Sequence, residues 1–199
     1  MVVEPTVSPA VELLPPRGLI LISGPSRGGK SGWAEHLAHR WGGPVLYLAT
    51  GPAAGSDPSW SERVAKHQER RPAGWRALEV GAELNEQLQV LAIESASGPL
   101  LLIDSLGTWL AWHLDDTPEQ WRARCDQLIH ALLAQSGPVV LVVEETGWGV
   151  VPATAVGGLF RDRLGALQQL LMQHCHSAWL VVAGRALNLM EHSLPVPPS

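Results

Sequence analysis

Residues 18–33 read G-L-I-L-I-S-G-P-S-R-G-G-K-S-G-W, and the rest of the chain is organised around this stretch. The apolar run at 19–22 predicts a strand that is buried on both faces. Residues 24–31 match G-x-x-x-x-G-K-[ST] at every fixed position, and a helical pattern follows them. A strand, a glycine-rich loop and a helix in this order indicate a phosphate-binding loop, so the sequence predicts a nucleotide-binding protein.

The residue types in the loop suit this chemistry. Gly24, Gly28 and Gly29 allow successive backbone N–H groups to converge on phosphate oxygens. The helix that begins near Lys30 adds the positive end of its dipole. We therefore expect Lys30 to reach the β- and γ-phosphates of the nucleotide and the Ser31 hydroxyl to be a ligand of Mg²⁺.

Composition limits the class of protein. A length of 199 residues suits a single α/β domain with a sizeable core. The net charge of -5 argues against a nucleic-acid partner, because no basic surface is indicated. No apolar run is long enough to cross a membrane, and the two cysteines form no C-x-x-C pattern, which favours a reducing compartment. We expect a cytoplasmic protein without a membrane span.

Strands and helices are expected to alternate along the chain. Proline-rich residues 1–17 and 191–199 are expected to be a flexible extension and a flexible tail on one domain at 18–190. After the first strand, further strands are predicted at 44–50, 75–80, 100–103, 138–143 and 177–184, with an edge strand at 185–190. Helices are predicted at 61–71, 82–94, 119–134 and 153–175. This alternation predicts an α/β fold whose mainly parallel sheet carries helices on both faces.

Acidic residues follow two of the predicted strands. Asp104 closes the strand at 100–103, and the carboxyl end of a parallel strand lies beside the phosphate loop. Asp104 is therefore a candidate for the second magnesium ligand. Glu144 and Glu145 follow another strand, where they are equally well a ligand-binding pair or an ordinary polar loop.

One histidine lies in a very polar segment. Residues 61–71 predict a short surface helix, with Ser61 as a candidate cap and Pro72 at its end. In the long helix at 153–175, Arg163 is expected on or beside the polar side. From the residues alone, His67 is best interpreted as an ordinary solvated histidine.

Several segments together match one enzyme family. They are G-P-S-R-G-G-K-S at 24–31, Y-L-A-T at 47–50, R-V-A-K-H-Q-E-R-R-P-A-G-W-R-A-L-E at 63–79, L-L-I-D-S at 101–105, E-T-G-W-G-V-V-P at 145–152, F-R-D at 160–162 and A-W-L-V-V-A-G at 178–184. With these segments the chain resembles the bifunctional adenosylcobinamide kinase and adenosylcobinamide-phosphate guanylyltransferase family of cobalamin biosynthesis. The resemblance covers about residues 18–190.

The resemblance implies a fold, an assembly and two reactions. The fold is a RecA-like phosphate-loop sheet with one antiparallel edge strand, and the assembly is a trimer. The kinase step moves the γ-phosphoryl group of ATP or GTP onto the aminopropanol hydroxyl of adenosylcobinamide. In the second step GTP places GMP on His67, pyrophosphate leaves, and GMP passes to the new phosphate to give adenosylcobinamide-GDP. A neutral imidazole is nucleophilic near pH 7 and suits this relay.

The resemblance also assigns roles by position. His67, Lys30 and Asp104 are implied to be catalytic, and Ser31 and Asp104 are implied to hold Mg²⁺. Nucleotide contacts are implied for Gly24, Pro25, Ser26, Arg27, Gly28, Gly29, Lys30, Ser31, Glu79 and Asp104.

Five positions depart from the usual pattern of the family. Gly28 replaces a serine, Trp112 and Glu144 replace asparagines, and Ala166 and Gln168 replace the arginine and asparagine of a G-R-x-N motif. Glu144 is expected to add a negative charge near the corrinoid phosphate.

Two other functions remain open from the sequence. One is a phosphate-loop kinase for another small alcohol, with His67 as a surface residue. The other is a nucleotide-binding regulatory protein that has lost its chemistry, for which the losses at 166 and 168 are the best support.

Overall fold

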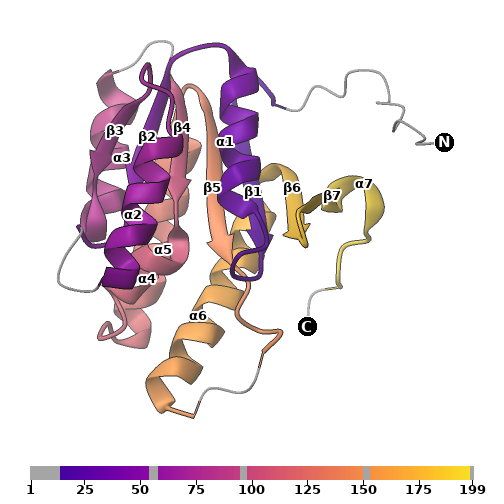
Figure 1. Ribbon diagram of the computed structural model, residues 1–199. Helices are drawn as coiled ribbons and strands as arrows, with labels where there is room; N and C mark the ends of the chain where they lie inside the picture. The colour runs from indigo at the N-terminus through magenta and orange to yellow at the C-terminus, as the bar shows by residue number, and fades with distance from the viewer. Residues whose placement is uncertain (1–13, 54–57, 95–97, 150–152, 198–199) are drawn as a thin grey trace.

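A single mainly parallel sheet forms the centre of the molecule. The computed structural model describes residues 14–53, 58–94, 98–149 and 153–197, except for the side chains of 58–60, 63, 66, 67 and 94. Within these residues seven strands lie in the order β3-β2-β4-β5-β1-β6-β7 (Figure 1). Their bounds are β1 (Gly18–Gly24), β2 (Val45–Ala49), β3 (Arg76–Glu79), β4 (Leu100–Asp104), β5 (Pro138–Glu144), β6 (Cys175–Val182) and β7 (Arg185–Asn188).

The strand directions agree with the predicted fold. Neighbouring strands from β3 to β6 pair in parallel, and β7 pairs with β6 in the antiparallel direction. The predicted α/β sheet and its antiparallel edge strand are therefore confirmed. The division into an extension at 1–17, a domain at 18–190 and a tail at 191–199 stays a prediction, because residues 1–13, 198 and 199 lie outside the described residues.

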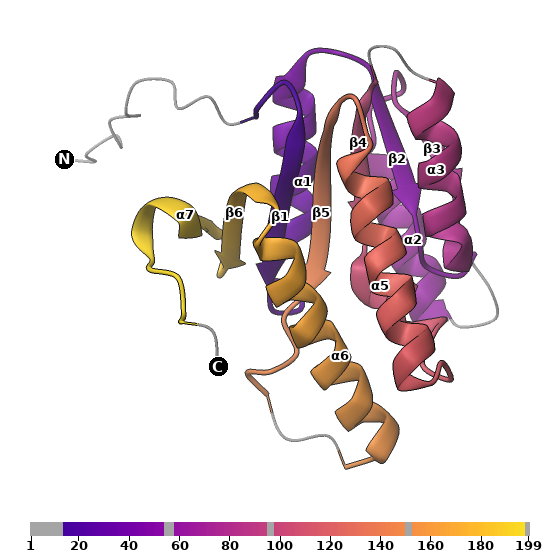
Figure 2. The ribbon, with the colours of Figure 1, turned by 180° about the vertical axis from the view of Figure 1, so that it is seen from behind.

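Helices cover both faces of the sheet. On one face lie α1 (Lys30–Trp41) and α2 (Pro58–Arg70) (Figure 1). On the other lie α3 (Leu84–Glu94), α4 (Leu106–Ala111), α5 (Pro118–Leu133) and α6 (Ala155–Met172). Figure 2, turned by 180°, shows α3, α5 and α6 in front of the sheet. A 3₁₀ turn, η1 (Gly81–Glu83), precedes α3, and the short α7 (Leu189–His192) follows β7. Within the described ranges, no helix has both the length and the apolar character that a bilayer crossing requires.

The two faces of the sheet bury separate hydrophobic cores. Strand residues such as Leu21 and Ile103 pack against α3 to α6, with Trp109 fully buried among them. Alternate strand residues such as Ile22 and Tyr47 face α1 instead. The central strands are thus apolar on both sides, as the continuous apolar runs in the sequence predict.

Two local predictions are wrong. Ser61 does not cap a helix, because α2 begins three residues earlier, at Pro58. Arg163 is not on a polar surface: it is buried, and its guanidinium group donates to the carbonyl oxygens of His113 and Asp116. A charged residue at a helical position therefore serves here to hold the loop between α4 and α5, because it satisfies backbone carbonyls that are shielded from water.

In the longest helix, the sequence pattern also predicts that Val156, Leu159, Leu164, Leu167 and Leu171 lie near one apolar stripe, and this is only partly correct. Leu164, Leu167 and Leu171 are fully buried, whereas Val156 and Leu159 are 54% and 39% exposed. The reason is visible in Figure 2, where the N-terminal half of α6 extends past the sheet that its C-terminal half covers.

Candidate nucleotide-binding site

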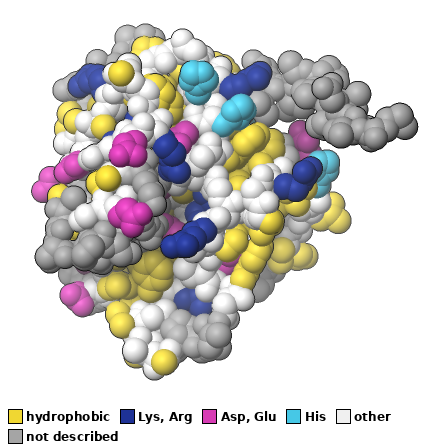
Figure 3. All heavy atoms as spheres, viewed as in Figure 1, with side chains coloured by type: hydrophobic (Ala, Val, Ile, Leu, Met, Phe, Trp, Pro, Cys, Tyr) yellow, Lys and Arg dark blue, Asp and Glu magenta, His cyan; other side chains and the backbone are white. Residues whose placement is uncertain are grey.

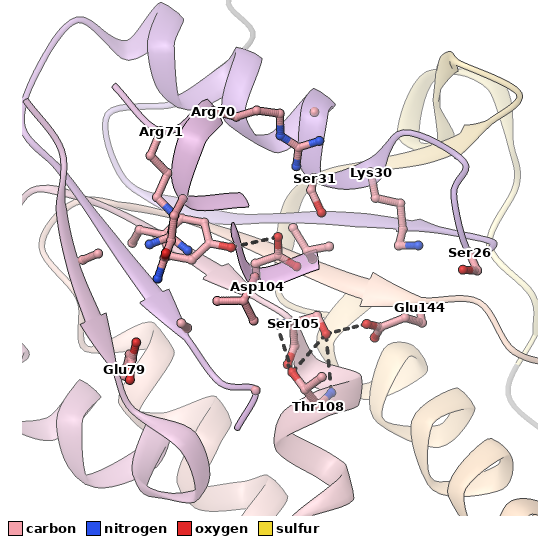
Figure 4. Close-up of a pocket in the computed structure, with 18 of the residues that line it drawn as sticks. Ser26, Lys30, Ser31, Arg70, Arg71, Glu79, Asp104, Ser105, Thr108 and Glu144 are labelled. Carbon is pink, nitrogen blue, oxygen red and sulfur yellow. Dashed lines mark hydrogen bonds between the residues drawn. The ribbon is translucent and has the colours of Figure 1, made fainter. Parts of the chain in front are cut away.

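A pocket of about 750 Å³ lies at the carboxyl edge of the sheet. Its walls come from loop residues 26–32, from the ends of β2, β4 and β5, and from Val64, Gln68 and Arg71 in or just after α2. Figure 3, viewed as in Figure 1, shows several Lys and Arg side chains near the middle of the molecule, among others spread over this side. Figure 4 shows side chains converging on the pocket from these elements. The carboxyl edge of a parallel sheet is the usual place for a ligand in such folds.

The phosphate loop is held tightly against β6. Gly24 has φ +151°, and a Cβ atom there would lie 2.1 Å from the carbonyl oxygen of Val181. Further along the loop, the Gly28 N–H donates to Pro25 O at 3.1 Å and the Gly28 carbonyl accepts from the Gly184 N–H at 3.1 Å. Gly29, the N-cap residue of α1, has φ +107°. These glycines therefore let the loop approach the neighbouring backbone and turn into the helix.

Lys30 and Ser31 lie at the start of α1, at the base of the pocket. Lys30 is 8% exposed, and its Nζ donates to the carbonyl oxygen of Pro25 at 2.9 Å. The Ser31 side chain lies beside it in Figure 4. Because both are at the N-terminus of a 12-residue helix, they share the pocket with the positive end of its dipole.

Asp104 projects into the same pocket from the end of β4. Its Oδ2 accepts a hydrogen bond of 3.1 Å from the hydroxyl of Tyr47 on the adjacent strand β2 (Figure 4). Burial, reinforced by the nearby Asp104 charge, raises the pKa of Tyr47, so the phenol remains protonated and is the donor. The carboxylate of Asp104 and the hydroxyl of Ser31 are oxygen donors lining one pocket, which is the ligand chemistry that Mg²⁺ prefers.

The carboxylate of Glu144 lines the pocket but is already hydrogen-bonded to other residues of the protein. Its carboxylate accepts hydrogen bonds from Ser105 Oγ and, at 3.0 Å, from the Gly107 N–H at the start of α4. Burial raises the pKa of Glu144, and the Ser105 hydrogen bond works in the opposite direction. Of the two carboxylates left open between a ligand-binding pair and a polar loop, only Glu144 lines the pocket, since Glu145 accepts a hydrogen bond from the Gly147 N–H and is not part of the pocket wall.

Two other unusual residues contact the same region. Trp112 donates from its indole nitrogen to Thr50 O at 2.8 Å, and Gln168 donates from its side chain to Glu144 O at 3.3 Å. Ala166, by contrast, is exposed on α6. Thr50 also contacts Thr108 at 2.6 Å, so hydroxyl groups join the ends of β2 and β4 to α4.

The end of α2 is fastened by two arginines. Arg70 forms an ion pair of 3.2 Å with Glu35 on α1, and the guanidinium carbon of Arg71 lies 3.9 Å from the centre of the Tyr47 ring. The same helix carries His67, whose side chain lies outside the described residues. Sequence reasoning missed Tyr47, Arg70 and Arg71, although all three fall within the segments at 47–50 and 63–79 that carry the resemblance.

Most of the predicted nucleotide contacts lie together. Eight of them line the pocket, namely Ser26, Arg27, Gly28, Gly29, Lys30, Ser31, Glu79 and Asp104. The other two do not line the pocket but hold the loop: Gly24 lies close to the Val181 backbone, and the Pro25 carbonyl oxygen accepts a hydrogen bond from Lys30.

Comparison with known proteins finds a family and several relatives that match most of this chain. A family model described as "Cobinamide kinase / cobinamide phosphate guanyltransferase" matches residues 20–189. The "Bifunctional adenosylcobalamin biosynthesis protein CobP" of Pseudomonas aeruginosa is 37% identical over 175 residues, which is 87% of this chain and 98% of that protein. The "Bifunctional adenosylcobalamin biosynthesis protein CobU" of Salmonella typhimurium is 33% identical over 180 residues, or 83% of this chain and 96% of that protein.

Among solved structures, the crystal structure of the RadB recombinase aligns with a TM-score of 0.46 at 14% identity. The alignment covers 84% of this chain and 75% of the RadB chain.

Proposed function

Because this chain belongs to the cobinamide kinase / cobinamide phosphate guanyltransferase family, we propose that both reactions of the family use the pocket above its phosphate loop. The protein is a bifunctional adenosylcobinamide kinase and cobinamide-phosphate guanylyltransferase of cobalamin biosynthesis. What the family does not fix is which residues of this chain perform each step.

The observation that carries the kinase assignment is the meeting of three elements in one cavity. Loop residues 26–29 bring backbone N–H groups, α1 brings Lys30 and Ser31, and β4 brings Asp104. Phosphoryl transfer needs mainly positioning and compensation of negative charge. Lys30 would compensate charge on the β- and γ-phosphates of ATP or GTP while the acceptor hydroxyl of adenosylcobinamide attacks the γ-phosphorus.

Magnesium fits the residues that are present. Ser31 and Asp104 offer a hydroxyl and a carboxylate at the wall of the pocket, both of them oxygen donors. Mg²⁺ held by these two residues would neutralise charge on the phosphate groups of the nucleotide.

The position of His67 on α2 supports its role in guanylyl transfer. Val64 and Gln68, one turn apart in α2, both line the pocket, and position 67 follows Val64 by three residues and precedes Gln68 by one. Residues spaced by three or four share one face of a helix, so we expect position 67 on the side of α2 that borders the pocket.

Guanylyl transfer proceeds through His67 in two displacements at the same phosphorus. A nitrogen of His67 attacks the α-phosphorus of GTP, an N–P bond forms, the bond to the bridging oxygen breaks, pyrophosphate leaves and the imidazole loses a proton. A phosphate oxygen of adenosylcobinamide phosphate then attacks the same phosphorus, the N–P bond breaks and the new pyrophosphate linkage forms. The pocket thus serves as donor site for the γ-phosphoryl group and then for GMP.

The test follows the fate of each phosphate. Protein incubated with Mg²⁺ and GTP labelled in the α-phosphate should retain label after denaturation, whereas γ-label should be lost with pyrophosphate. The bond should be labile in acid and stable in alkali, because protonation of a phosphoramidate nitrogen creates a good leaving group. Incubation with adenosylcobinamide and ATP or GTP should give the phosphate form, and GTP should then give the GDP form.

Two neighbouring residues provide the matched pair of variants. His67→Ala should abolish the α-label and the GDP product while the kinase product remains, and Lys66→Ala should keep the label. A folded, GTP-binding protein that acquires no α-label would contradict the transferase assignment. Failure to form adenosylcobinamide phosphate would contradict the kinase assignment.

The assembly is also part of the proposal. The family resemblance implies a trimer, which light scattering of the purified protein would test directly. A cytoplasmic location would be tested by fractionation of cells that express the chain.

A further inference from the structure

Tyr47, the single tyrosine of the chain, lies between the groups assigned to the two reactions. It is 2% exposed in the middle of β2, on the side of the sheet that α1 covers. A buried phenol needs a hydrogen-bond partner for its hydroxyl while its ring packs against other groups. Here the hydroxyl and the ring have different partners, and each partner belongs to a different part of the proposed site.

The hydroxyl of Tyr47 orients the acidic residue of the kinase step. It donates to Oδ2 of Asp104 at 3.1 Å, from the strand that pairs with β4. A hydrogen bond from a buried donor to an ionised carboxylate is stronger than one between neutral groups, and it fixes the plane of the carboxylate. Asp104 is therefore held in one orientation before any ligand arrives.

The ring of Tyr47 supports the arginine that follows the histidine helix. The guanidinium carbon of Arg71 lies 3.9 Å from the ring centre, and Arg71 Nε is buried with no hydrogen-bond partner among the described residues. None of the described side chains of α2 belongs to either hydrophobic core. The position of the C-terminal end of α2 therefore depends on polar fastenings, of which the contact between Arg71 and Tyr47 is one.

From these contacts we infer that Tyr47 is a positioning residue for both reactions. Its hydroxyl orients Asp104 for magnesium, and its ring places Arg71 and the end of α2 beside the nucleotide. The inference rests on the proposed function, because it takes Asp104 as a magnesium ligand and α2 as the carrier of GMP.

Two substitutions at position 47 separate the two contacts. Tyr47→Phe removes the hydroxyl and keeps the ring, so Mn²⁺ binding in the presence of a non-hydrolysable GTP analogue, measured by electron paramagnetic resonance, should weaken about tenfold. The Mg²⁺ concentration that half-activates the kinase should rise by a similar factor, and saturating Mg²⁺ should restore the rate. Tyr47→Leu removes the ring as well, so the rate of α-phosphate labelling should fall about tenfold even at saturating Mg²⁺.

Arg71→Lys tests the ring contact without altering the core. It keeps the positive charge but loses the planar group that stacks on Tyr47. Its labelling rate should also fall about tenfold at saturating Mg²⁺, whether or not Tyr47→Leu folds. Ser177→Ala is the matched control for the hydroxyl, since Ser177 Oγ is buried in β6 without a partner in the described part of the chain. Its removal should leave Mn²⁺ binding unchanged.

The outcomes separate this inference from the proposed function. Asp104→Asn should weaken Mn²⁺ binding at least as much as Tyr47→Phe. Normal Mn²⁺ binding by Asp104→Asn would remove the proposed magnesium site and this inference with it. Weak binding by Asp104→Asn beside normal binding by Tyr47→Phe would overturn the role of the hydroxyl and leave the proposed function standing. Normal labelling by Arg71→Lys would overturn the role of the ring.

Discussion

Gly24→Ala tests the placement of the phosphate loop against β6. The new Cβ atom would lie 2.1 Å from Val181 O, whereas ordinary contact begins at 3.4 Å. The loop or the strand must therefore retreat by about 1 Å. Such overpacking costs about 1–3 kcal/mol. The alanine must also adopt φ +151°, and backbone strain of this kind adds about 1–3 kcal/mol.

The same movement should disturb the nucleotide site. Gly24 O accepts a hydrogen bond of 2.8 Å from the Glu145 N–H, so the displaced loop would also lose its contact with the residue after β5. A misplacement of about 1 Å in a catalytic group can reduce turnover about a hundredfold. We expect Gly24→Ala to lose about 2–6 kcal/mol of unfolding free energy. Both enzymatic activities should fall about a hundredfold.

Two measurements test the expected effects of Gly24→Ala on stability and nucleotide binding. Urea unfolding followed by the fluorescence of the nine tryptophans reports stability, and titration with a fluorescent GTP analogue reports nucleotide affinity. Gly165→Ala is the control, since a Cβ there meets nothing within 4 Å inside α6. It should raise stability by about 1 kcal/mol, because alanine favours a helix over glycine, and leave GTP binding unchanged. Wild-type stability and affinity in Gly24→Ala would show that the loop does not lie against β6 as described.

Three further changes test other parts of the molecule. Lys30→Ala should lower both the kinase rate and α-phosphate labelling at least about a hundredfold in steady-state assays, and near-normal rates in a folded protein would contradict the phosphate-loop assignment. Burial raises the pKa of Glu144 above its ordinary value of 4.5, so the folded protein is favoured by the protonated form, and this part of the unfolding free energy is lost as pH rises through the raised pKa. In urea unfolding from pH 5 to 8, Glu144→Gln should therefore become more stable relative to the wild type as pH rises. A difference that stays constant with pH would refute this. Arg163→Ala should lower the unfolding free energy by about 1–3 kcal/mol, because the carbonyl oxygens of His113 and Asp116 lose their donor; no loss in thermal unfolding would show that these carbonyls are satisfied otherwise.

The sheet and the loop were predictable because each depends on a local pattern. The apolar run at 19–22 and the G-P-S-R-G-G-K-S segment together determine strand, loop and helix. Gly24 and Gly29 have positive φ angles, which glycine adopts readily, and this requirement arises within the segment itself. The place of Asp104 followed from strand direction, because parallel strands bring their carboxyl ends to one edge. The loop motif and the direction of the parallel strands can both be deduced without knowing the tertiary contacts.

The parts that escaped prediction depend on partners distant in sequence. Tyr47 was recognised as a member of a buried strand, but its link to Asp104 spans 57 residues and has no periodic signal. Arg163 was expected at a polar helix surface because periodicity cannot show that the loop after α4 presents carbonyl groups to it. The expectation that Glu144 adds a charge near the substrate stays a prediction, but its hydrogen bonds to Ser105 and Gly107, about forty residues earlier, had no signal in the sequence.

The three departures at Trp112, Glu144 and Gln168 also bear on whether the site has lost its function. A site that decays leaves buried polar groups without partners, since each substitution removes one member of a pair. Here the opposite holds: each of the three makes a hydrogen bond at the carboxyl edge of the sheet, to Thr50 O, to Ser105 and Gly107, and to Glu144 O respectively. Their contacts brace α4 and the end of β5 while Lys30, Ser31 and Asp104 line the pocket beside them. These three departures therefore form hydrogen bonds beside the proposed nucleotide site, whereas Ala166 is exposed on α6. The three contacts weigh against the interpretation of this chain as a regulatory protein that has lost its chemistry.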